Sequence, residues 1–201
     1  MEELLNSNGV ILINSFIYFT SEEKKELEQK FEKNNMKIFY LEQRGIQNSI
    51  FEGMEIILNN NLFNMLVGGL LMPVAYDILK TSLVSIVNKI KNSNGKIVRA
   101  HRAAESVNAV IKIKMDAGEI IASIEQELST EEVEKYIQAF VKAYEIANNT
   151  PNGKNQYFIV DKTSDNNLEI LTLPDYLKKH NKIWVKNTFI FRSLLQTDTS
   201  S

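Results

Sequence analysis

Apolar and charged positions are unevenly distributed along the chain, and residues 56–76 form a long stretch without a charged residue. Segments rich in Lys and Glu lie on both sides of it. Such a run is typical of a buried core segment, a membrane-active helix or a self-association surface. Which of these applies decides most of what the sequence can say about function.

The first part of the chain has the pattern of a β-α-β unit. Residues 9–19 are rich in Val, Ile, Phe and Tyr and predict a buried strand. Thr20 and Glu23 have the spacing of a capping box, which predicts a helix over residues 21–34. Residues 36–41 predict a second strand. Because a helix connects the two strands, we expect them to be parallel.

The centre of the chain is predicted to be helical. Apolar side chains from Ile46 to Leu58 recur at helical spacing, which predicts a helix over residues 46–58. The uncharged run then continues past Gly68, Gly69 and Pro73, where we expect a kink because Pro removes a helix hydrogen bond. Residues 77–91 follow as an amphipathic helix.

A β-hairpin and a capped helix are predicted next. Residues 109–115 alternate, with Lys112 and Lys114 on the polar side, and predict a half-buried strand. Residues 119–124 return as its partner after a turn at 116–118. Ser129 and Glu132 form a second capping box, so we expect a helix to follow.

The pattern after residue 148 predicts a β-rich extension. Strands are expected at 157–160, 168–173 and 183–192, with a short helix starting at Pro174. Together the elements predict an α+β or α/β fold. We assign residues 1–148 to one domain, 149–192 to the β-rich part and 193–201 to a polar tail.

Composition narrows the class of protein. With 44% hydrophobic and 24% charged residues, the 201-residue chain is expected to fold as a globular domain. A net charge of −2 disfavours non-specific electrostatic binding to nucleic acid. The absence of Cys excludes disulfides, thiolate metal sites and Cys nucleophiles. The first residues lack the basic start of a secretory signal, so a cytoplasmic location is expected.

Candidates for chemistry are few, and we predict no catalytic residue, metal site or cofactor. His101 and His180 lie far apart without the spacing of metal ligands. Arg99, His101 and Arg102, with Glu105 nearby, form the one cluster that could bind a phosphate group. A solvated connector is the simpler interpretation of that cluster.

Three interpretations of the uncharged run remain open. The preferred one is a kinked core helix, for which a lysine at Leu70 should unfold the protein. A membrane role is an alternative, although a helix over residues 62–76 would be only about 22 Å long, short of the roughly 30 Å of a bilayer core. The third is a buried oligomer interface, at which Gly68, Gly69, Met65 and Met72 would allow close helix approach. The interaction or membrane segment comprises Leu66, Gly68, Gly69, Leu70, Leu71 and Pro73.

The order of elements resembles the effector-associated constant component family of bacterial conflict systems. The matching pieces are the strand–helix–strand start, the apolar stretch around Gly68 and Gly69, the hairpin at 116–118 and the helix after Ser129. The resemblance covers about residues 9–148; the strands after 148 and the insert around His101 depart from it. It implies a non-catalytic accessory or adaptor protein that works beside effector and sensor proteins in antiphage immunity. It carries over no catalytic residues.

Three functional hypotheses follow. The first is a non-catalytic interaction or adaptor module of the bacterial cytoplasm that binds a protein partner, with a homo-oligomer as a variant. The second is a membrane-acting effector that uses residues 62–91 and associates with the membrane when activated. The third is an enzyme or binder of a phosphate-bearing ligand. Nucleic acid is not an expected partner.

Overall fold

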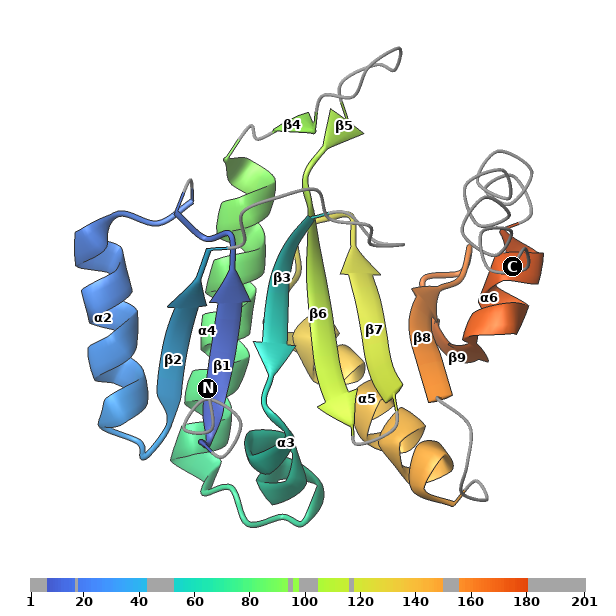
Figure 1. The fold of residues 1–201 in the computed structure, drawn as a ribbon, viewed down its shortest axis with the longest axis horizontal. Helices are drawn as coiled ribbons and strands as arrows, with labels where there is room; N and C mark the ends of the chain where they lie inside the picture. Colours follow the sequence, from blue (N-terminus) through green and yellow to red (C-terminus); the bar gives the residue numbers. More distant parts are fainter. Residues whose placement is uncertain are drawn as a thin grey trace, which may run out of the picture.

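The computed structural model describes residues 7–16, 18–42, 53–93, 96–97, 105–115, 118–149 and 156–180. In this part, a seven-stranded mixed sheet is combined with five helices, which confirms the predicted α+β or α/β class (Figure 1). The strands, in sheet order, are β2 (Lys37–Leu41), β1 (Gly9–Ile13), β3 (Gly53–Leu58), β6 (Asn108–Met115), β7 (Gly118–Ile124), β8 (Gln156–Lys162) and β9 (Leu168–Thr172). The short strands β4 (Lys96–Ile97) and β5 (Glu105–Ser106) pair separately. The helices are α2 (Ser21–Glu32), α3 (Asn60–Val67), α4 (Pro73–Asn92), α5 (Thr130–Asn148) and α6 (Leu173–Lys179).

The predicted β-α-β start is confirmed, because β1 and β2 pair in parallel and α2 connects them. The capping box is present: the Glu23 backbone N–H donates to Thr20 Oγ1 at 3.3 Å, and the Thr20 N–H donates to Glu23 Oε2 at 2.8 Å. The strand β1 is shorter than predicted and ends at Ile13. Asn14 follows it with a left-handed φ of 62°, which interrupts the extended backbone.

The helix predicted over residues 46–58 is wrong where the structure describes it, because residues 53–58 form the strand β3. β3 lies between β1 and β6, antiparallel to the first and parallel to the second. Both faces of a central strand are covered, so its sequence is apolar without clear alternation and can imitate a buried helix. Residues 46–52 lie outside the described part of the chain.

The kink expected between Gly69 and Pro73 is replaced by a complete break between two helices. α3 ends at Val67 and α4 begins at Pro73. The predicted amphipathic character of α4 is confirmed, because Leu79, Leu83 and Ile86 are all buried. The run of residues 56–76 therefore contributes to a strand, a helix, a connection and the start of a second helix.

The C-terminal half follows the predicted hairpin and helix. β6 and β7 pair antiparallel, and both bonds of the Ser129–Glu132 capping box are formed at the start of α5. β8 then pairs in parallel with β7, so the strands after residue 149 extend the same sheet. The Thr172 hydroxyl accepts the Asp175 N–H at the start of α6, and Pro174 lies in the first turn of that helix, as predicted. The predicted strand 183–192 lies outside the described residues.

The two faces of the sheet differ in their cover. Side chains of α2, α3, α4 and α5 share one large core with alternate strand residues such as Ile56, Ile111 and Ile113. On the opposite face, α6 packs on a small cluster around Val110. Lys112 also lies on that face and, contrary to the predicted half-buried strand, is 9% exposed. Its Nζ donates to Glu55 Oε1 at 2.6 Å, which compensates both charges.

Candidate interaction surface

The connection between α3 and α4 places large apolar side chains on the surface. Leu70 is 71% exposed, Met72 59% and Val74 62%. Scattered apolar residues are common on protein surfaces, but a contiguous apolar patch marks an interaction site. Leu70, Met72 and Val74 are exposed within five positions of the chain, and this concentration makes the connection the strongest candidate surface in the described chain.

The backbone of the connection explains why these side chains are exposed. The Leu70 N–H donates to the Met65 carbonyl at 2.8 Å, and the Gly69 N–H donates to the Leu66 carbonyl at 3.2 Å. With Gly69 at φ 65°, this is a Schellman motif, which ends α3 and satisfies its last carbonyls. Pro73 is then the first residue of α4, where its missing N–H costs nothing. The residues between these two signals belong to neither helix.

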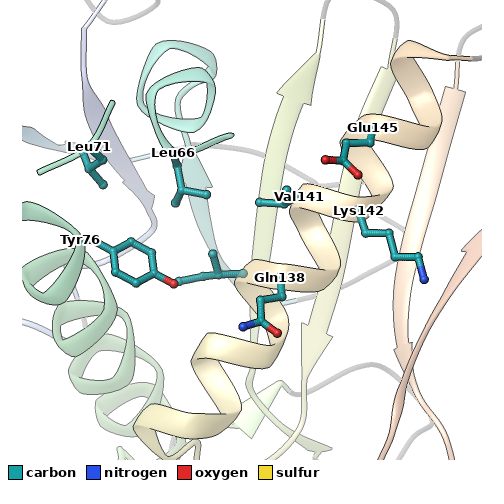
Figure 2. A pocket seen from close by; sticks show the side chains of 8 residues that line it. Leu66, Leu71, Tyr76, Gln138, Val141, Lys142 and Glu145 are labelled. Carbon is teal, nitrogen blue, oxygen red and sulfur yellow. The ribbon is translucent and has the colours of Figure 1, made fainter. Parts of the chain in front are cut away.

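A groove lies between this connection and α5. It has a volume of about 480 Å³ and is lined by Leu66, Leu71, Tyr76, Ile137, Gln138, Val141, Lys142 and Glu145. Figure 2 shows Leu66, Leu71 and Tyr76 facing the side chains of α5 across it. The connection together with the first two residues of α4 (residues 68–74) and the lining of the groove are called the α3–α5 surface below.

Two hydrogen bonds fix the walls of the groove relative to each other. The Tyr76 hydroxyl donates to Glu134 Oε1 at 2.6 Å and joins α4 to α5. The Tyr144 hydroxyl donates to Asn64 Oδ1 at 2.7 Å and joins α5 to α3. The Tyr144 ring also packs edge-on against Phe63, with ring centroids 5.4 Å apart. Glu134 precedes the α5 residues that line the groove, and Tyr144 adjoins the last of them, Glu145, so the groove is held near both ends.

Near the Tyr76 end of the groove, the charged side chains of α4 and α5 are paired with one another. Lys80 Nζ lies 3.3 Å from both Asp77 Oδ1 and Glu134 Oε2. The hydrogen bond from Tyr76, followed by Lys80, lowers the pKa of Glu134 below its ordinary value although partial burial opposes this. Burial and the bond to Glu134 raise the pKa of Tyr76. At neutral pH, Glu134 is therefore ionised and Tyr76 is a neutral donor.

The structure brings together the residues of the predicted interaction segment. Leu66 and Leu71 are half-buried and line the groove, while Gly68, Gly69, Leu70 and Pro73 are exposed in or beside the connection. The expectation that Leu70 is core is wrong. Sequence reasoning considered Met72 only as a residue of a buried oligomer interface, and it missed the exposed Val74 and the α5 wall. Ile137 and Val141 belong to the helix predicted after Ser129, but nothing local in the sequence identifies the partner of that helix.

The phosphate cluster stays a prediction, because Arg99, His101 and Arg102 lie outside the described residues. His180 is described and does not stand alone: its Nε2 lies 3.0 Å from Asp161 Oδ2. Among the described residues, no group of three or more His, Asp or Glu side chains has the arrangement of a metal site. In the same residues, no helix combines the length and apolarity needed to cross a membrane.

Comparisons with known proteins give no further guide. No family model matches the chain, and no curated protein or solved structure matches it.

Proposed function

We propose that this chain is a non-catalytic interaction module that binds a protein through the α3–α5 surface. The observation that carries the proposal is the exposure of Leu70, Met72 and Val74 next to an apolar groove. Burying these side chains against a partner would remove apolar area from water, which is the main favourable term in protein association.

The composition of the surface fits a protein partner. The core of a protein interface is depleted in charge and enriched in Met and aromatic residues. Residues 56–76 carry no charge and supply Met72 and Tyr76 to the surface. The charged members of the groove, Lys142 and Glu145, both lie on α5 and are exposed, as expected for an interface rim.

The membrane-acting alternative uses the same exposed residues, but it also requires residues that are buried in the structure. Leu79, Leu83 and Ile86, the apolar face of α4, are buried in the main core. Presenting residues 62–91 to lipid would uncover that core. Peptides that bind membranes also carry Lys and Arg for anionic lipids, but Lys80 and Lys89 of this segment are already paired with Glu134 and Glu23. Protein binding at the preformed surface needs no such rearrangement.

The resemblance to the effector-associated constant component family supplies the cellular setting of the proposal. In that setting the module is an accessory component of a bacterial immunity system, and it acts beside effector or sensor proteins without chemistry of its own. The observed surface supports the binding part of this proposal, and the resemblance alone supports the antiphage part.

The test is a phage-protection assay in bacteria that carry the chain together with its neighbouring reading frames. Leu70→Lys and Met72→Lys should abolish protection, since each places a charge at the centre of the interface. Phe16→Lys is the matched control, because Phe16 is also exposed, at 64%, but lies outside the α3–α5 surface. Circular dichroism of each purified variant would show that it is folded.

Full protection by both folded variants would contradict the proposed surface. Leakage of phosphatidylcholine–phosphatidylserine vesicles by the wild type, lost in Leu70→Lys, would favour the membrane-acting alternative instead. Protection that fails equally in Phe16→Lys would show that the effect is not specific to this surface.

A further inference from the structure

The strand β9 forms one edge of the sheet, at the end opposite β2, and among the described strands it pairs only with β8 (Figure 1). Next to the turn that joins them, the Thr163 N–H donates to the Asn167 carbonyl at 2.9 Å. In an antiparallel pair only every second residue bonds to the neighbouring strand. Counted from Asn167 along the register, the backbone N–H and C=O groups of Leu168 and Ile170 point away from β8. They form the outer edge of the sheet.

A groove lies beside this edge, between β9 and α5. It has a volume of about 530 Å³, and its walls include Lys135, Ala139 and Lys142 of α5 and Leu168 and Ile170 of β9. Leu168 and Ile170 are half-buried, and their side chains pack against the main core on the face that α5 covers. This hollow is called the β9 groove below. It is separate from the groove of the α3–α5 surface, although Lys142 lines both.

The α5 wall of the β9 groove is positively charged. The side chains of Lys135 and Lys142 are exposed, and in the described part of the chain no carboxylate forms an ion pair with either of them. Figure 2 shows Lys142 directed away from Tyr76. Glu169 also lines the groove, but its carboxylate is paired with Lys179. The groove therefore favours an occupant that carries negative charge.

The edge decides the conformation of the occupant. A helix bonds its own backbone groups to one another and has none to offer to Leu168 and Ile170, whereas an extended segment supplies a matching row of donors and acceptors. Natural edge strands are commonly protected against such pairing by Lys or Pro. β9 contains neither residue, and its groove side carries Leu168 and Ile170.

We propose that the β9 groove binds an extended acidic segment of a partner protein, which joins the sheet as a further strand beside β9. The backbone of the segment bonds to Leu168 and Ile170, as in other proteins that take up a peptide at a sheet edge. Alternate side chains of the segment point toward α5. This second binding site goes beyond the proposed function and does not rest on it.

The lining of the groove predicts which sequence binds best. Ala139, Leu168 and Ile170 form an apolar part of the wall, and Lys135 and Lys142 lie before and after Ala139 on α5. The two lysines are separated by about 10 Å along the helix axis. Side chains on one face of a strand recur about every 6.8 Å. An apolar side chain with a carboxylate two positions before it and another two positions after it therefore brings both carboxylates within reach of the flexible lysines.

The experiment is fluorescence polarisation of the labelled peptide Thr-Glu-Thr-Val-Thr-Glu-Thr, titrated with the purified full chain. The wild type should bind it, and Lys135→Glu should weaken binding about fivefold or more, since it puts like charges opposite each other. A peptide with Lys in place of both Glu should bind the wild type poorly and the double variant Lys135→Glu, Lys142→Glu better. Lys25→Glu is the matched control, because Lys25 is an exposed lysine of α2, outside the β9 groove.

Amide hydrogen exchange, followed by NMR, tests the strand addition itself. The peptide should slow exchange of the Leu168 and Ile170 amides by about tenfold or more, because they gain hydrogen bonds. The Glu169 and Leu171 amides, which face β8, should change little. N-methylation of the peptide at one set of alternate residues should abolish binding, and N-methylation at the other set should be tolerated.

Three results would overturn the proposal. The first is no saturable binding of the acidic peptide by the wild type. The second is protection of the Leu168 and Ile170 amides in the free chain, which would show that the edge is covered without a partner. The third is an equal loss in Lys135→Glu and Lys25→Glu, which would reduce the effect to net charge. Leu70→Lys should bind the peptide like the wild type, so its phage protection tests the α3–α5 surface independently of this site.

Discussion

Two parts of the uncharged run, residues 56–63 and residues 70–74, have opposite environments. The first contains three Asn residues, yet Ile56, Leu58, Leu62 and Phe63 are all at most 1% exposed. The second contains no polar side chain, yet Leu71 is its one residue that is not exposed. The more apolar segment is the one that faces solvent.

The backbone, rather than hydrophobicity, accounts for this difference. Residues 56–58 are hydrogen-bonded in the middle of the sheet, and Leu62 and Phe63 follow within α3, which packs on the main core. Residues 70–72 lie between a Schellman motif and the start of α4, and Pro73 and Val74 are the first two residues of that helix. An apolar segment that is held at the surface in this way is available for a partner.

The largest effect is expected in the buried part. Phe63→Ala should lower the free energy of unfolding by roughly 3–5 kcal/mol, because it leaves a cavity between α3 and α5. Phe16→Ala, which truncates an exposed ring, should change it by less than about 0.5 kcal/mol. Urea denaturation of both variants measures the contrast, and similar losses would show that exposure does not separate these sites.

The same contrast of environment applies to two lysines on one face of β6. Lys112→Ala should cost roughly 3–5 kcal/mol, because it leaves the buried Glu55 carboxylate without its partner. Lys114→Ala, two positions along the strand and exposed, should be nearly neutral. Equal midpoints for the two variants at the same denaturant slope would contradict the buried ion pair.

The break between the two parts can be tested at Gly69. Gly69→Ala should cost about 1–2 kcal/mol, because φ is 65° and a Cβ is disfavoured there even though no atom lies within 4 Å of its position. Gly69→Asn should cost less, since Asn tolerates the left-handed region. If Ala and Asn prove equally harmless in thermal denaturation, α3 does not end in a left-handed residue.

A smaller effect is expected at Tyr76, whose hydrogen bond to Glu134 joins α4 to α5 just after the exposed residues 70–74. Tyr76→Phe removes the hydrogen bond to Glu134 and should cost about 1 kcal/mol at neutral pH. The pKa of Glu134 is lowered in the folded state, so its stabilisation is present above 4.5, its ordinary value, and is lost as the pH falls through the lower folded value. Tyr76→Phe should therefore make stability fall less steeply in that acidic range.

Tyr144→Phe is the control for this pH dependence. It removes a hydrogen bond of similar length, but its acceptor, Asn64, does not titrate. Urea denaturation at neutral pH and at several values below 4.5 should show similar losses for the two variants at neutral pH and a changed slope only for Tyr76→Phe. Parallel slopes would show that Tyr76 does not hold the Glu134 carboxylate.

Elements with local signals were predictable from the sequence. The helices α2 and α5 begin at capping boxes, in which residues three apart satisfy each other. β3 was not predictable in this way, because its neighbours β1 and β6 are distant in sequence and cover both of its edges. The same applies to Lys112, whose partner Glu55 is found only once the register of β3 and β6 is known.

Only one of the two walls of the candidate surface could be predicted from the sequence. Gly69 is a helix stop signal and Pro73 is a helix start signal, so in this order they indicate the end of one helix and the beginning of the next. Only a kink was expected from them. The sequence therefore identified the segment from Leu66 to Pro73, but it did not predict which of these side chains are exposed. The opposite wall comes from α5, more than sixty residues later in the chain, and no local pattern connects the two.

The most direct test of the account is a pair of lysine substitutions eight positions apart in the same uncharged run. Leu62 is fully buried and Leu70 is 71% exposed. Urea denaturation should show that Leu62→Lys unfolds the protein or destabilises it by several kcal/mol, because the buried ammonium has no partner. Leu70→Lys should stay within about 0.5 kcal/mol of the wild type. Comparable destabilisation by both substitutions would show that residues 70–74 are core and would remove the basis for an interaction surface.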